Sequence, residues 1–222
     1  MPTPTNHFTR ILGKGGVATL IAGFALNAAN LPNPSADENR SPKTETVVLA
    51  GGCFWGVQAV FSAVKGVSSA VSGYSGGSKA NAHYEIVSTG TTGHAESVQV
   101  TYDPAQVSFG QLLKIYFSVV HDPTELNRQG PDEGTQYRSE IFYTNDEQKR
   151  VADAYIQQLT AAKVFPKPIV TRVAPLQAFY RAEDYHQDYV AHNPTQPYVA
   201  YNDVPKLANF KKQYPELAKA GK

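Results

Sequence analysis

The residue with the clearest chemical potential is Cys53, the only cysteine in the sequence, in the run Gly51-Gly52-Cys53-Phe54-Trp55-Gly56. An apolar stretch at 47–50 precedes the run, and apolar residues at helical spacing follow it. This pattern predicts a strand, a glycine turn and a helix that ends near Gly66. The amides and dipole of a helix N-terminus favour a thiolate, so the sequence predicts an activated nucleophile. The alternative is a buried, inert thiol, because free cysteine is among the most often buried residue types.

A second candidate is Glu96, which begins a strictly alternating stretch at 96–102. The alternation predicts a half-buried strand, and Glu96 is in phase with its apolar residues Val98, Val100 and Tyr102. A carboxyl group that faces a core is desolvated, which raises its pKa and lets it act as an acid near neutral pH. The alternative is a glutamate at a strand edge that simply reaches solvent.

The other candidate catalytic motifs in the sequence are weaker. The run Gly73-Tyr74-Ser75-Gly76-Gly77 matches the G-x-S-x-G turn of serine hydrolases, but residues 78–81 offer no helix start with an apolar face, so we interpret it as a turn. His186 is the best partner for a cysteine hydrolase that uses Cys53, although a structural histidine fits the position equally well. No spacing of histidine, cysteine and aspartate suggests a metal site.

The composition indicates one domain with extensions. The chain has 222 residues, 41% of them apolar and 18% charged, which is enough to bury a substantial core. The formal net charge is +1, and no basic run is present. These features argue against nucleic acid as a partner.

The N-terminal stretch differs from the rest of the chain. Arg10 and Lys14 precede a short apolar segment at 17–26, and small residues follow it. This order predicts a secretory signal peptide at 1–29 and a periplasmic or otherwise exported protein. The alternatives for this segment are an uncleaved anchor and a disordered leader, and the alternative location is the cytoplasm. We expect a flexible linker at 30–43 and a catalytic domain at 44–222.

The rest of the chain mixes strands and helices. We expect strands at 140–143 and 169–173 and a short helix at 182–191. Capping boxes at Ser108/Gln111 and Thr144/Glu147 predict two helix starts, the second helix running to about Ala162. Only the first unit looks like a strand–helix–strand crossover, which favours an α+β fold with a mixed sheet. The long polar segment 121–139 is a candidate functional loop.

From residue 47 to residue 217 the chain resembles the A-type peptide methionine sulfoxide reductases. Five blocks carry the resemblance in family order: Gly52-Cys53-Phe54-Trp55-Gly56; Tyr74-Ser75-Gly76-Gly77; Gly93-His94-Ala95-Glu96; the segment from His121-Asp122-Pro123-Thr124 through Asn127-Arg128-Gln129-Gly130 to Gly134-Thr135-Gln136-Tyr137-Arg138-Ser139; and Ala182-Glu183-Asp184-Tyr185-His186-Gln187. We therefore expect a two-layer α+β sandwich with a mixed sheet, a ferredoxin-like core and long functional loops.

The resemblance implies reduction of methionine S-sulfoxide, free or in oxidised proteins, to methionine, and thus protein repair. It implies that Cys53 attacks the sulfoxide sulfur and is left as a sulfenic acid. Glu96 would protonate the leaving oxygen, and Tyr84 and Tyr137 would hydrogen-bond that oxygen.

The resemblance also implies a substrate-binding set. Phe54 and Trp55 would hold the substrate methyl group against an aromatic wall. Asp132 in the long loop and His186 would bind or position the substrate. Two other classes stay open: a hydrolase that uses Cys53 or Ser75, and a non-enzymatic module that binds methyl-bearing side chains.

The sequence departs from the common pattern of the family in two ways. Gln58 stands where many members have a glutamate, and the recycling cysteines near the C-terminus are missing. The tail 196–203 resembles the single-cysteine branch of the family. We therefore expect no bound cofactor. The reductant is expected to be external, either a small thiol or a thioredoxin-like or glutaredoxin-like protein. We also expect the protein to be a monomer.

Overall fold

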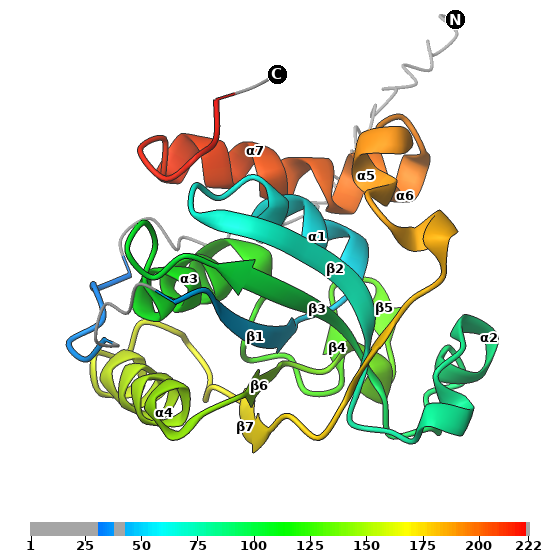
Figure 1. The fold of residues 1–222 in the computed structure, drawn as a ribbon, viewed down its shortest axis with the longest axis horizontal. Helices are drawn as coiled ribbons and strands as arrows, with labels where there is room; N and C mark the ends of the chain where they lie inside the picture. The colour runs from blue at the N-terminus through cyan, green and yellow to red at the C-terminus, as the bar shows by residue number, and fades with distance from the viewer. Residues whose placement is uncertain (1–30, 38–42, 221–222) are drawn as a thin grey trace, which may run out of the picture.

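The described residues, 31–37 and 43–220 of a computed structural model, form a six-stranded mixed sheet in the order β7–β6–β1–β3–β2–β8 and a two-stranded ribbon, β4–β5 (Figure 1). The strands are β1 (Glu45–Ala50), β2 (Val67–Ser75), β3 (Ala95–Tyr102), β4 (Arg128–Gln129), β5 (Asp132–Glu133), β6 (Glu140–Tyr143), β7 (Arg172–Pro175) and β8 (Phe179–Arg181). The helices are α1 (Phe54–Ser62), α2 (Tyr84–Val87), α3 (Phe109–Ile115), α4 (Asp146–Ala161), α5 (Tyr189–His192), α6 (Pro197–Asn202) and α7 (Val204–Gln213).

The four central strands have the ferredoxin-like order β6–β1–β3–β2. β1 and β2 both pair antiparallel with β3, and helix α1 connects them. β3 and β6 both pair antiparallel with β1, and α3 lies between them in the chain. The core is therefore two interleaved split βαβ units, which confirms the predicted α+β class. The sequence indicated only the first unit, because the segment 121–139 separates α3 from β6.

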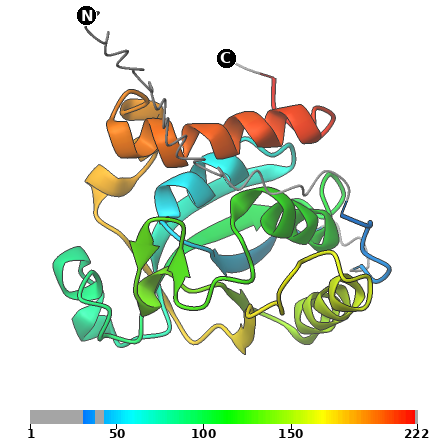
Figure 2. The ribbon, with the colours of Figure 1, turned by 180° about the vertical axis from the view of Figure 1, so that it is seen from behind.

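Parallel pairing of β7 with β6 makes the sheet mixed, as predicted. On one face, alternate residues such as Leu49, Val98 and Ile141 pack against α1, α3 and α4 in the main core. On the other face, Val48 and Phe142 belong to a smaller cluster that is covered by residues near β8. Helix α7 packs on α1 (Figures 1 and 2).

The two predicted helix starts differ in outcome. Ser108 caps α3 through the expected capping box with Gln111. The box predicted at Thr144 and Glu147 is wrong, because the N-cap of α4 is Asn145, whose side chain accepts from the amide of Gln148. Helix α4 itself ends close to its predicted end.

Two predictions in the C-terminal third are wrong in position or type. The strand expected at 169–173 begins at Arg172 as β7. The helix expected at 182–191 is broken into a 3-10 turn, Asp184–His186, and the short α5. Asp188 lies between them with a φ of 52°, a left-handed conformation that a continuous α-helix does not allow.

Part of the predicted flexible linker, 30–43, is packed against the domain. Leu31 is buried in the main core, and the carboxylate of Asp37 accepts hydrogen bonds from the hydroxyl of Ser108 and the amide of Gly110 at the start of α3. The flexible interpretation is therefore wrong for 31–37, because these contacts hold the segment. The predicted signal peptide at 1–29 lies outside the described residues. Within the described part of the chain, no helix is long and apolar enough to cross a membrane.

Removing the Asp37 carboxylate tests whether this segment stabilises the domain. We expect Asp37→Ala to lower the free energy of unfolding by about 1 kcal/mol, because it removes the hydrogen bonds that Ser108 and Gly110 donate to this carboxylate at a helix N-terminus. Urea unfolding measures the change, and Glu216→Ala, at an exposed position, is the control. Equal stability of both variants and the unmodified protein would contradict the role of this segment.

Candidate active site

The glycine turn before α1 carries Cys53. β1 ends at Ala50, whose carbonyl accepts a hydrogen bond of 2.6 Å from the hydroxyl of Tyr116. Gly52 has a φ of 87°, and a Cβ there would lie 2.6 Å from the side chain of Gln129. Only glycine satisfies both conditions. Cys53 follows as the N-cap residue of α1, which confirms the predicted strand–turn–helix arrangement.

The side chain of Glu96 contacts the first residue of α1. Its Oε2 accepts a hydrogen bond of 3.0 Å from the amide of Phe54, the first residue of α1. The side chain is buried, and burial raises the pKa of its carboxyl group to about 8, against the opposing effect of the Phe54 hydrogen bond. The nearby carboxyl groups of Asp132 and Asp203 act in the same direction as burial. The inward orientation and raised pKa predicted from strand alternation are confirmed.

The thiol of Cys53 differs from its prediction. Burial, and after it the negative charges of Glu96 and Asp203, raise the pKa of the thiol well above its usual value. The amide of Trp55 and the ammonium of Lys206 lower it, but by less. The prediction that Cys53 ionises readily is therefore wrong for the resting site, because desolvation outweighs the helix N-terminus.

Cys53 and Glu96 both line one cavity of about 280 Å³. The complete lining is Cys53, Phe54, Trp55, Tyr84, Glu96, Asp132, Tyr137, Gln196 and Tyr198. Seven of the eight predicted site residues are therefore together, and the exception is His186. Burial, followed by the charge of Glu96, raises the pKa of both Tyr84 and Tyr137. The two phenols consequently stay protonated and can donate hydrogen bonds into the cavity.

Aromatic side chains form one wall of the cavity that Cys53 lines. Phe54 is buried, and Trp55 is partly exposed and stacks on Tyr189 with ring centroids 3.9 Å apart. The ring of Tyr198 meets Trp55 edge-on at 6.0 Å. This stacking fixes the indole, which gives an apolar substituent a defined surface beside the thiol.

His186 lies behind this wall instead of lining the cavity. Its Nδ1 accepts a hydrogen bond of 3.1 Å from the indole Nε1 of Trp55, and its ring packs against Phe54 and Tyr84. Burial lowers the pKa of the imidazole, so the ring is neutral and Nε2 carries its proton. The predicted substrate-binding role is therefore corrected to one of holding Trp55.

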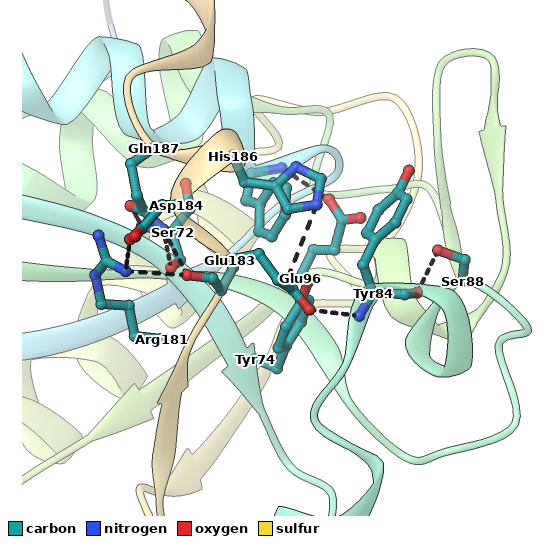
Figure 3. Close-up of polar contacts among 12 residues, drawn as sticks. Ser72, Tyr74, Tyr84, Ser88, Glu96, Arg181, Glu183, Asp184, His186 and Gln187 are labelled. Carbon is teal, nitrogen blue, oxygen red and sulfur yellow. Dashed lines mark hydrogen bonds and ion pairs between the residues drawn. The ribbon is translucent and has the colours of Figure 1, made fainter.

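Glu183 is a residue that the sequence reasoning missed, although it belongs to one of the family blocks. Figure 3 shows its carboxylate between Tyr74, Tyr84 and His186. It accepts 2.8 Å and 3.0 Å hydrogen bonds from the hydroxyl of Tyr74 and the amide of Tyr84. These contacts place the start of α2, and thus the Tyr84 ring, at the cavity.

The tail supplies the other residues that the sequence reasoning missed. Gln196 and Tyr198 line the cavity, and the hydroxyl of Tyr198 donates to the carboxylate of Asp132. The resemblance of the tail at 196–203 to the single-cysteine branch was the available signal. It did not indicate that the tail closes one side of the site.

Gln58 and Ser75 have structural surroundings. The amide of Gln58 donates to Ala70 and Gln187 and accepts from Ser72 and the Asp188 amide, so a neutral side chain satisfies this buried position. Ser75 is buried within β2, and its hydroxyl has no hydrogen-bond partner among the described residues. Neither residue lines the cavity, and within the described ranges no base hydrogen-bonds to the Ser75 hydroxyl as a hydrolase requires.

Sequence comparison agrees with this geometry. Residues 45–218 match the family model described as "Peptide methionine sulfoxide reductase". The chain is 61% identical over 181 residues to "Peptide methionine sulfoxide reductase MsrA 2" of Mesorhizobium japonicum, covering 82% of this chain and 93% of the relative. It is 52% identical over 211 residues to the protein of the same name from Synechocystis, covering 92% and 99%.

Solved structures support the same assignment. Reduced Mxr1 from Saccharomyces cerevisiae superposes with a TM-score of 0.62 at 32% identity, covering 73% of this chain and 92% of that one. Methionine sulfoxide reductase A of Corynebacterium diphtheriae gives 0.59 at 37% identity, covering 70% and 78%. The chain belongs to the peptide methionine sulfoxide reductase family. It is therefore an oxidoreductase that reduces methionine sulfoxide.

The raised pKa of Glu96 can be measured directly. We expect the infrared difference spectrum between the unmodified protein and Glu96→Gln to contain a protonated carboxyl band at pH 6 that disappears as the pH rises through about 8. Glu183→Gln is the control, because the hydrogen bonds that Glu183 accepts offset its burial and lower its pKa. A carboxylate signal for Glu96 at pH 6 would contradict the burial argument.

Proposed function

We propose that Cys53 is the nucleophile of the sulfoxide reduction and that Glu96 is its acid. The observation that carries the proposal is that the thiol of Cys53, at the N-cap of α1, and the buried, protonated carboxyl group of Glu96, which is hydrogen-bonded to the first amide of α1, line one aromatic cavity. A sulfoxide oxygen is a poor leaving group, and a proton donor at that oxygen lowers the barrier to its departure.

The reaction balances on the residues that line the cavity. The sulfur of Cys53 bonds to the sulfoxide sulfur, while Glu96 protonates the oxygen and Tyr84 and Tyr137 donate hydrogen bonds to it. The oxygen then moves to the sulfur of Cys53: its bond to the substrate sulfur and the bond between the two sulfurs break, a bond between the oxygen and Cys53 forms, and methionine leaves with Cys53 as S–OH. The sulfoxide is thereby reduced by two electrons and Cys53 is oxidised by two. The proton that Glu96 gives to the oxygen stays in the S–OH, and the proton that the thiol gives up returns Glu96 to its protonated form.

The aromatic wall supplies substrate selection. Phe54 and Trp55 form an apolar surface for the methyl group, with Asp132 and Tyr198 on the polar side of the same cavity. This arrangement supports recognition of one sulfoxide configuration, because the oxygen must lie toward Glu96 while the methyl group lies toward the wall.

An external thiol completes the cycle, since the sequence has no second cysteine. One thiol condenses with the sulfenic acid to give a mixed disulfide and water. A second thiol then releases Cys53 and leaves as the disulfide of the reductant. A small thiol or a thioredoxin-like or glutaredoxin-like protein provides this chemistry.

Two substitutions test the assignment. We expect Cys53→Ser to abolish reduction of a peptide containing methionine S-sulfoxide in excess dithiothreitol, because no nucleophile remains. Glu96→Gln should slow the reaction by about 100-fold, since it removes the acid and keeps the shape. The released methionine is quantified by chromatography.

The controls are Glu85→Gln, at an exposed glutamate on α2, and Ser75→Ala. Both should keep near-normal rates. Turnover by Cys53→Ser would refute the nucleophile. Hydrolysis of a chromogenic ester that survives Cys53→Ser and is lost in Ser75→Ala would favour a serine hydrolase.

We also propose that the protein is exported. The basic residues Arg10 and Lys14, followed by the short apolar segment 17–26, support a cleaved signal peptide at 1–29. We expect mass spectrometry of the exported fraction of the source cells to find a new N-terminus near residue 30. An intact Met1 confined to the cytoplasmic fraction would contradict export.

A further inference from the structure

Asp203 is a buried aspartate that the proposed mechanism does not use. It lies between α6 and α7 and is fully buried. An aspartate at the N-cap of a helix ordinarily accepts a hydrogen bond from an amide of the first turn, but the Asp203 side chain makes no such bond to α7. Neither of its oxygens has a hydrogen-bond partner among the described residues. A buried carboxyl group left in this state requires an explanation.

The carboxyl group points toward the helix that carries the nucleophile. A Cβ on Gly56, in the first turn of α1, would lie 2.3 Å from Oδ1 of Asp203. Glycine at this position therefore lets the carboxyl group approach the helix backbone three residues after Cys53. The packing of α7 on α1 holds the two elements together (Figure 1).

Lys206 is the partner of this carboxyl group. Its Nζ lies 3.6 Å from Oδ1 of Asp203, and 19% of the lysine side chain is exposed. Burial raises the pKa of Asp203 to about 6, while Lys206 opposes that rise. At neutral pH Asp203 is therefore mainly a carboxylate, and it lies with Lys206 beside the first turn of α1.

The two charges act on the thiol in opposite directions. Asp203 raises the pKa of Cys53 and Lys206 lowers it, with burial as the largest cause of the rise. Glu96 also raises it, but Glu96 is itself protonated below about pH 8. Asp132 is engaged by the hydroxyl of Tyr198, and the phenols of Tyr84 and Tyr137 stay neutral.

We propose that the Asp203–Lys206 pair, buried against the first turn of α1, controls when the thiol of Cys53 becomes nucleophilic. Asp203 adds to the effect of burial, which keeps the resting thiol protonated, and Lys206 limits the contribution of Asp203, so that the pair adjusts the pH at which the thiolate forms. Both are positioning residues that act through Cys53. The inference rests on the proposed role of Cys53 as the nucleophile.

Alkylation of Cys53 by iodoacetamide across a pH series tests the proposal in the full chain, since the thiolate is the reacting form. We expect Asp203→Asn to move the midpoint of the rate profile down by about one pH unit, as for loss of a nearby like charge. Well below the midpoint this makes alkylation about 10-fold faster. Lys206→Met should move the midpoint up.

The matched controls are Asp153→Asn and Lys149→Met, which break an exposed ion pair on α4 and should leave the midpoint unchanged. Circular dichroism checks the fold of each variant. If Asp203→Asn does not fold, Lys206→Met alone decides, because its side chain is only partly buried. An unmoved midpoint, or displacement of both variants in the same direction, would overturn the proposal.

Failure of this inference is separable from failure of the proposed function. Alkylation needs no sulfoxide turnover, so an unchanged midpoint refutes only the role of the charge pair. Sulfoxide reduction by Cys53→Ser would refute the role of Cys53 as the nucleophile, whatever the alkylation profiles show.

Discussion

The site depends on one buried hydrogen bond, from the first amide of α1 to the carboxyl group of Glu96. Strand register makes this bond possible. Leu49 of β1 pairs with Val98 of β3, so Glu96 lies beside the glycine turn that follows β1 and carries Cys53. The nucleophile and the acid therefore meet at one helix end, although 42 residues separate the bonded groups in the chain.

Residues of the C-terminal third cover Cys53 and Glu96 and so complete the reactive site. Tyr189 stacks on Trp55, His186 holds the indole, and Tyr198 closes the cavity beside Asp132. The removal of water that follows raises the pKa of both Cys53 and Glu96. For the acid this is useful in itself, because the proton must be present at neutral pH. For the thiol it means that ionisation depends on nearby charges more than on the helix N-terminus.

Short sequence patterns predicted the features that depend on residues close together in the chain. Strand alternation gave the inward direction of Glu96, and the capping box at Ser108 gave the start of α3. The helix expected at 182–191 failed because tertiary contacts hold Asp188 in a left-handed conformation that composition does not indicate. The positions of Glu183, Tyr198 and Asp203 depend on partners far away in the chain. The resemblance located the site, but neither it nor the sequence pattern gave the balance between burial and the helix dipole at Cys53.

The pH dependence of a single turnover tests the central claim, that a buried and protonated Glu96 drives the departure of the oxygen. With methionine S-sulfoxide and no reductant, the unmodified protein should form methionine about 100-fold faster than the Glu96→Gln variant at pH 6, and the ratio of the two rates should fall as the pH rises through about 8. The ratio is compared because ionisation of the Cys53 thiol raises the rate of both proteins as the pH rises. A ratio that does not change across this pH range would show that the proton comes from another group and would contradict the account.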